Sequence, residues 1–148
     1  MNRIILSLTT IVLLASCGGG SNKKLNEDQP STDTTAKSAV PAMADFKVDM
    51  SPEHIALGHA TYHEICAPCH GEGGKGDGPA ALALNPKPRD HTNGVYMDKL
   101  TNAHIFHVVK GGGAQFGYPG MPPQPQLADD SVKNVIVFVR SLSKTYKQ

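Results

Sequence analysis

Cys66, Cys69 and His70 fall within five consecutive residues, and this cluster constrains the fold more than any other feature of the sequence. Three positions make almost one helical turn, so in a helix the two thiols lie on one side with the imidazole beside them. The third cysteine, Cys17, stands far from this group. An odd number of cysteines is unsuited to a framework of disulfides. We therefore expect Cys66 and Cys69 to act together and Cys17 to act separately.

The C-x-x-C pair is compatible with three kinds of site. A zinc site takes four ligands, usually with a second close pair of Cys or His, and no cysteine follows Cys69. A thioredoxin-like dithiol needs a βαβ context, which the flanking sequence does not offer. C-x-x-C-H is the attachment motif of c-type haem, whose iron accepts a histidine ligand. The motif predicts one covalent haem c, linked through Cys66 and Cys69, with His70 as an axial ligand of the iron.

The composition agrees with a small helical domain. The 148 residues are 39% hydrophobic and include 15 Gly, 11 Pro and no Trp. Frequent Gly and Pro favour short helices joined by loops. A small loop-rich domain needs a stabilising cross-link or cofactor in addition to its core, and haem would fill this role. The 14 basic and 13 acidic side chains nearly balance. The sequence therefore indicates no basic surface of the kind that binds nucleic acid.

The N-terminus is organised like a secretory signal. Arg3 precedes an apolar stretch at residues 4–14, which is too short for a membrane span of about 20 residues. The stretch ends in Leu-Ala-Ser-Cys at Cys17, which resembles the lipobox of bacterial lipoproteins. The resemblance implies a signal peptide at residues 1–16, a lipidated Cys17, and export to a bacterial membrane facing the periplasm. An ordinary cleaved signal followed by a stray cysteine is the alternative.

Residues 17–47 and 48–148 differ in pattern. The first segment is rich in Gly, Ser, Asn, Lys, Asp and Thr and has no sustained hydrophobic period, which predicts a flexible tether after the lipidated cysteine. Its length corresponds to a typical reach of roughly 30 Å. The second segment contains the periodic patterns and is the predicted folded domain.

Three helices are indicated within that domain. Residues 51–53, Ser-Pro-Glu, form a helix start that leads towards Cys66, with Ser as the N-cap and Pro in the first turn. A second helix is expected to have Thr101 as its N-cap and Gly111 as the glycine just past its end. A third runs from Asp129 or Asp130 to Leu142, where apolar residues recur at intervals of three and four: Val132, Val135, Ile136, Val139 and Leu142.

Around the attachment motif, the sequence resembles class I cytochromes c, especially bacterial monohaem and oxidase-associated domains, over about residues 51–143. The resemblance rests on residues 62–71, 76–81, 86–90, 110–112, 120–122 and 127–142. It implies an all-α class I cytochrome c fold, with three to five short helices wrapped around one covalent haem. It also implies that the N- and C-terminal helices cross at Gly58, a position where glycine is otherwise costly in a helix, with Phe138 as a candidate contact.

The resemblance implies a methionine as the second axial ligand. Met121 lies in Tyr-Pro-Gly-Met-Pro-Pro at residues 118–123, where Pro and Gly favour an extended loop. Met97 is the runner-up and is better explained as a packing residue. His91, His104 and His107 are further candidates in principle.

A backbone carbonyl that accepts a hydrogen bond from the iron-binding histidine is the other feature implied. Class I cytochromes use a Pro carbonyl to accept the N–H of the proximal imidazole, which tunes the iron. Pro86 and Pro88 both suit this role, and the sequence does not separate them. Gly is frequent in residues 71–78, and this stretch is expected to form a loop against the haem edge.

These features predict an electron carrier, a membrane-tethered monohaem cytochrome passing single electrons between respiratory donor and acceptor complexes. With both axial positions filled, no small-molecule substrate would bind the iron, so we expect no enzyme activity and a monomeric domain. A permanently bound subunit of a respiratory oxidase or reductase complex is the alternative. A c-type peroxidase would need a second haem motif, and a cytochrome c′ sensor would place its motif near the C-terminus.

Overall fold

The computed structural model describes residues 44–148. The predicted signal peptide at residues 1–16, the lipidation site Cys17 and nearly all of the predicted tether lie outside the described residues. Within residues 44–148, no helix has both the length and the apolar character needed to cross a bilayer.

Five α-helices and two 3-10 helices make up the described domain, and no strand occurs among these residues. The all-α prediction is confirmed. In chain order the elements are α1 (Pro52–Ile65), α2 (Ala67–His70), η1 (Pro79–Ala83), α3 (Gly94–Met97), α4 (Asn102–Gly111), η2 (Ala114–Phe116) and α5 (Asp129–Leu142).

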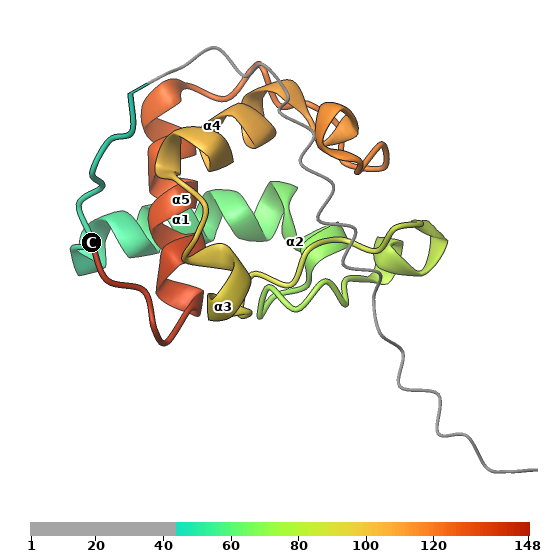
Figure 1. Ribbon diagram of the computed structural model, residues 1–148, viewed down its shortest axis with the longest axis horizontal. Coiled ribbons are helices and arrows are strands. Elements are labelled where there is room, and N and C mark those ends of the chain that lie inside the picture. Colours follow the sequence, from blue (N-terminus) through green and yellow to red (C-terminus); the bar gives the residue numbers. More distant parts are fainter. Residues whose placement is uncertain (1–43) are drawn as a thin grey trace, which may run out of the picture. The chain divides into compact units, whose positions relative to one another are not determined.

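The first and last long helices, α1 and α5, cross and pack against each other (Figure 1). The contact is close at Gly58, where an added Cβ would lie 1.9 Å from the Asn134 carbonyl oxygen and 3.0 Å from the Phe138 Cβ. Any larger side chain would push the helices apart, so glycine is required here by the close approach. The predicted crossing at Gly58 and its contact with Phe138 are both confirmed.

The core forms around α5. Val132, Val135, Ile136 and Val139 are all buried, as their spacing predicts. The neighbouring residues 137, 138 and 140 are buried as well. Residues 135–140 of α5 are therefore buried on every face of the helix, and α1, α4 and the segment around α3 pack around them.

Arg140 is buried in this core, with 2% of its surface exposed, which the apolar pattern did not predict. Its Nε donates to Oδ1 of Asn102 at 2.9 Å, Nη1 donates to the Met97 carbonyl at 2.7 Å, and Nη2 donates to the Leu100 carbonyl at 2.5 Å. A buried guanidinium is tolerated when its donors are satisfied in this way. Arg140 therefore joins α5 to the connection between α3 and α4.

Helix α4 begins as expected, since the Thr101 side chain accepts a hydrogen bond from the His104 amide at 3.0 Å. Its end differs from the prediction by one residue. Gly111 still belongs to the helix, and the positive-φ glycine that ends it is Gly112, with φ of 80°. Glycine adopts this conformation without steric cost, so the two consecutive glycines made the exact end ambiguous in the sequence.

Candidate functional site

Cys66, Cys69 and His70 are brought to one face by the turn that links α1 to α2. The His70 amide donates to the Cys66 carbonyl at 2.8 Å, and the Cys69 amide donates to the same oxygen at 3.1 Å. At about 100° per residue, this turn places the two thiols and the imidazole within one arc of the helix. Ala67 and Pro68 fall on the other face. The helical turn expected from the spacing of Cys66, Cys69 and His70 is therefore present.

The His70 ring is held in a defined orientation. Only 8% of the residue is exposed, and its Nδ1 donates to the backbone carbonyl of Arg89 at 3.1 Å. Burial lowers the pKa of His70, and the hydrogen bond to Arg89 only partly opposes this effect. With the proton on Nδ1, the lone pair is on Nε2, which is the atom left to bind a metal.

The prediction of a Pro86 or Pro88 carbonyl at this position is corrected by the structure. The acceptor is the carbonyl of Arg89, the residue directly after Pro88. The sequence indicated the correct segment but not which of its carbonyls faces His70, because that depends on how the chain turns between residues 86 and 90.

His91, which the sequence offered only as a further ligand candidate, stacks on the His70 ring. The ring centroids are 4.2 Å apart and the ring planes differ by 18°. The His91 Nδ1 and the buried Tyr62 hydroxyl are 3.2 Å apart and share a hydrogen bond. Burial, followed by the neighbouring His70 and Arg89, lowers the pKa of His91 well below its usual value. Because it lies against His70, His91 belongs to the His70 side of the site.

The glycine-rich loop at residues 71–78 folds back onto α2. The Gly76 amide donates to the His70 carbonyl at 2.8 Å, and the Gly78 amide donates to the Cys69 carbonyl at 3.2 Å. A Cβ at Gly78 would lie 2.5 Å from the carbonyl oxygens of both Ala67 and Pro68. We call residues 66–78 together with 89–91 the proximal segment.

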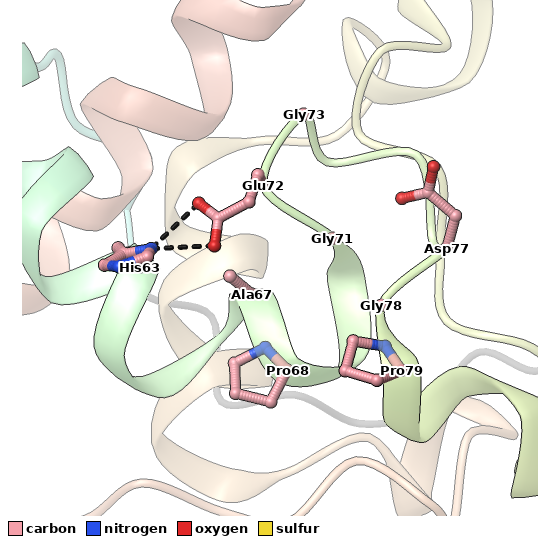
Figure 2. A pocket seen from close by; sticks show the side chains of 9 residues that line it. All are labelled: His63, Ala67, Pro68, Gly71, Glu72, Gly73, Asp77, Gly78 and Pro79. Carbon is pink, nitrogen blue, oxygen red and sulfur yellow. Dashed lines mark hydrogen bonds and ion pairs between the residues drawn. The ribbon is translucent and has the colours of Figure 1, made fainter.

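A pocket of about 560 Å³ lies behind the attachment turn (Figure 2). His63 and Glu72 close one side of it, with His63 Nδ1 2.8 Å from both carboxylate oxygens of Glu72. Asp77 lies at the opposite side in the same view. Neither thiol nor His70 lines this pocket, so it is separate from the face that carries the motif.

Both thiols of the motif are free. Burial, followed by the neighbouring Cys69, raises the pKa of the Cys66 thiol to about 11. Catalytic dithiols instead have a cysteine whose pKa is lowered. This difference argues against a thioredoxin-like redox site, in agreement with the sequence.

Met121 lies in a loop that returns to the end of α4. We call residues 112–123 the distal loop. The Gly113 amide donates to the Met121 carbonyl at 3.0 Å, and the Met121 amide donates to the Tyr118 carbonyl at 3.0 Å. The second bond closes a four-residue turn from Tyr118 to Met121, with Pro119 in its favoured second position.

Met97, the runner-up, lies in the hydrophobic core at 3% exposure. It packs beside α5, and its carbonyl accepts from Arg140. Its surroundings are those of a packing residue.

The remaining histidines are dispersed. His104 packs against Phe116 with ring centroids 4.8 Å apart, and His59 packs against Phe138 at 4.9 Å. His54 Nδ1 lies 2.7 Å from Oδ1 of Asn134. His107 differs from these, because its Nε2 is buried without a hydrogen-bond partner in residues 44–148.

The donor set fits a covalent haem c. Two unpaired thiols and an imidazole with its Nε2 available share one face of the turn. Among residues 44–148, no group of three His, Cys, Asp or Glu side chains forms a metal site. The haem motif thus remains as the explanation of this cluster, since a zinc site would need four such ligands.

Comparison with known proteins agrees with this chemistry. Residues 53–139 match the family model described as cytochrome C oxidase, cbb3-type, subunit III. No curated protein matches the chain. A chain in the solved Kuenenia stuttgartiensis reducing HAO-like protein complex Kustc0457/Kustc0458 is 27% identical, with a TM-score of 0.55; the match covers 67% of this chain and 48% of that chain.

This protein therefore spans about half of the length of that solved chain. The family match reaches from the second residue of α1 almost to the end of α5 and includes the attachment turn. The chain accordingly belongs to the cbb3-type cytochrome c oxidase subunit III family, and it is a c-type cytochrome that binds haem c covalently and takes part in electron transfer.

Proposed function

We propose that this protein is a membrane-tethered monohaem electron carrier, with haem c joined to Cys66 and Cys69 and its iron held by His70 and Met121. The observation that carries the proposal is the arrangement of His70 in the attachment turn. Its Nδ1 is occupied by the Arg89 carbonyl, and its Nε2 is available beside two free thiols. When bound, haem supplies a one-electron Fe(III)/Fe(II) couple.

The residues around His70 keep the imidazole neutral and oriented. Burial lowers its pKa, so the ring carries no proton on Nε2 at neutral pH. The carbonyl of Arg89 accepts the Nδ1 proton, which fixes the tautomer and makes the ring a better donor. The stacked His91 ring limits rotation of His70 about its side-chain bonds.

Met121 is favoured over Met97 as the second ligand by their surroundings. The Met97 side chain is buried in the core, and moving it would leave a cavity beside α5. Met121 is half-buried at the end of a turn, where a thioether remains available. A methionine opposite a histidine raises the reduction potential relative to two histidines.

The tether is proposed from the sequence. Removal of residues 1–16 would leave Cys17 as the lipidated N-terminus, and residues 17–47 would link it to the cytochrome domain at residues 48–148. Several acyl chains on one residue anchor a protein stably. The domain would then move near the periplasmic face of a membrane between a respiratory electron donor and an acceptor.

A fixed subunit of a respiratory complex is the second candidate. It is favoured by the match to a family named for an oxidase subunit, and by the similar chain in a solved redox protein complex. Extraction in mild detergent distinguishes the two functions. A carrier should purify alone, whereas a subunit should purify with its complex.

Mass spectrometry of the mature, natively exported protein tests the site. We expect a mass increment for one haem, which the double variant Cys66→Ser/Cys69→Ser should lack. The matched control is Cys17→Ser, which should keep the haem but release the protein from the membrane. A mature wild-type protein without the haem increment would contradict the proposal.

A further inference from the structure

Arg89 contacts both sides of the site through different parts of the same residue. Its backbone carbonyl accepts the hydrogen bond from His70 Nδ1 at 3.1 Å. Its guanidinium carbon lies 3.8 Å from the centre of the Tyr96 ring and 5.0 Å from the centre of the Tyr118 ring. Both distances are within the range of cation–π attraction. The side chain is therefore shared by two aromatic rings from separate segments.

The two rings differ in how firmly they are anchored. Tyr96 belongs to α3, and the next residue, Met97, is buried in the core. Tyr118 begins the turn that the Met121 amide closes by donating to the Tyr118 carbonyl at 3.0 Å. A restraint on the Tyr118 ring is therefore transmitted through one short turn to the backbone of Met121.

Within residues 44–148, the guanidinium of Arg89 has no ion pair that would compete for its charge. Arg89 is only half-buried, so its contact with the rings is a moderate one. Removing a contact of this kind changes an equilibrium constant by about two- to five-fold.

We propose that Arg89 is a positioning residue that joins the two axial-ligand segments: its carbonyl orients His70, and its guanidinium, between Tyr96 and Tyr118, holds the Met121 turn closed. The inference rests on the proposed role of Met121 as an iron ligand. A side-chain substitution at Arg89 leaves the carbonyl in place, so the two roles are separable by experiment.

Imidazole titration of the ferric, natively matured protein measures opening of the turn. Added imidazole replaces a methionine sulfur only when the distal loop moves away, and loss of the far-red sulfur–iron absorption band reports the replacement. We expect Arg89→Met to bind imidazole about two- to five-fold more tightly than wild type. Arg89→Lys should fall between the two, because it keeps the charge without the planar group.

A double-mutant cycle assigns the effect to the Tyr118 contact. Tyr118→Leu should raise imidazole affinity by a similar factor, and adding Arg89→Met to it should cause little further change. Lys87→Met is the matched control, because it removes an exposed positive charge from the same segment. It should leave imidazole affinity unchanged, and urea unfolding of each variant separates loop opening from global stability.

Three outcomes would overturn the inference alone. The first is an Arg89→Met variant that matches wild type in imidazole affinity. The second is an Arg89→Met effect that persists in full in the Tyr118→Leu background, and the third is a Lys87→Met variant with the same increase. Absence of the sulfur–iron band from wild-type protein, or its survival in Met121→Ala, would instead refute the Met121 assignment and the inference that rests on it.

Discussion

The proximal segment and the distal loop carry the two proposed iron ligands, yet they are held by different kinds of contact. In the proximal segment, His70 is buried and its ring is fixed by the Arg89 carbonyl and the stacked His91. The backbone near His70 and near His91 is held by hydrogen bonds as well. The Gly76 amide donates to the His70 carbonyl, and the His91 amide donates to the Gly74 carbonyl at 2.7 Å.

The distal loop is held mainly at its base. Gly112 and Gly113 are buried against Met121 and Pro123, where an added Cβ would lie within 3.1 Å of their atoms. Most residues from 114 to 120 are exposed. The Tyr118 amide donates to the Gly113 carbonyl at 2.9 Å, so the loop closes on itself rather than on the core.

These two kinds of contact indicate which side of the site can change its conformation. Segments with few buried contacts open locally at low free energy, whereas core segments open only with most of the fold. The proximal side therefore supplies a constant ligand. Opening, and exchange of the second ligand, should begin on the distal side.

Replacing each of the two methionines with alanine should give the largest difference between variants. Met121→Ala should abolish the far-red sulfur–iron band, lower the reduction potential and allow the reduced protein to bind carbon monoxide, because the ligand is lost. Met97→Ala should keep the band but lose about 2–5 kcal/mol of unfolding free energy, because it empties a core position. Spectra and urea unfolding of both variants check this, and a reversed pattern would make Met97 the ligand.

Two glycine substitutions compare the rigidity of the two sides. Gly78→Ala should destabilise the protein by about 3 kcal/mol, because the Cβ would overlap the carbonyls of Ala67 and Pro68. Gly117→Ala should cost only about 1 kcal/mol, because the Cβ meets open space and only the positive φ of 84° is strained. Denaturant unfolding measures both. Equal losses would mean that the proximal loop shifts as easily as the distal one.

Hydrogen exchange tests the same difference without mutation. The Gly76 and Tyr118 amides both donate to backbone carbonyls, at 2.8 Å and 2.9 Å. After correction for intrinsic rates, the Gly76 amide should exchange at least about 100-fold more slowly than the Tyr118 amide. Comparable protection would show that the distal loop opens only when the whole domain unfolds.

A small pH effect is expected where α4 meets the distal loop. Burial, followed by the nearby His107, lowers the pKa of His104 below its usual 6.5. As the pH falls below about 6.5, His104 therefore binds a proton more readily in the unfolded chain than in the folded one. The unfolding free energy is then partly lost as the pH falls. Unfolding free energies at about pH 7.5 and 5.5 should differ less in His104→Gln than in wild type. An unchanged pH difference in the variant would contradict this assignment.

Much of the fold was predictable because its signals are local. The start of α4 follows from its Thr101 cap and the start of α1 from the proline in its first turn, although the Ser51 side chain makes no capping hydrogen bond. Both ends of α5 follow from its apolar spacing. The crossing at Gly58 was predicted from a resemblance rather than from a pattern. The end of α4 was wrong by one residue, because either of two adjacent glycines was able to end it.

In the site, too, the local features were predictable and the contacts between distant segments were not. The grouping of Cys66, Cys69 and His70 needs only one helical turn, and the sequence predicted it. The acceptor for His70 was predicted at Pro86 or Pro88 and is the carbonyl of Arg89. The assignment of Met121 remains a proposal, supported by the core position of Met97.

The attachment motif, the helical class of the domain and the helix that forms its core were all predictable from the sequence, because these depend on residues a few positions apart. The folded domain was needed to show that His91 stacks on His70, that Arg140 is buried, and that Arg89 lies between Tyr96 and Tyr118. Each of these contacts joins segments that are distant in the chain. They are set by how the helices pack, because no local pattern specifies which distant side chain fills a given space.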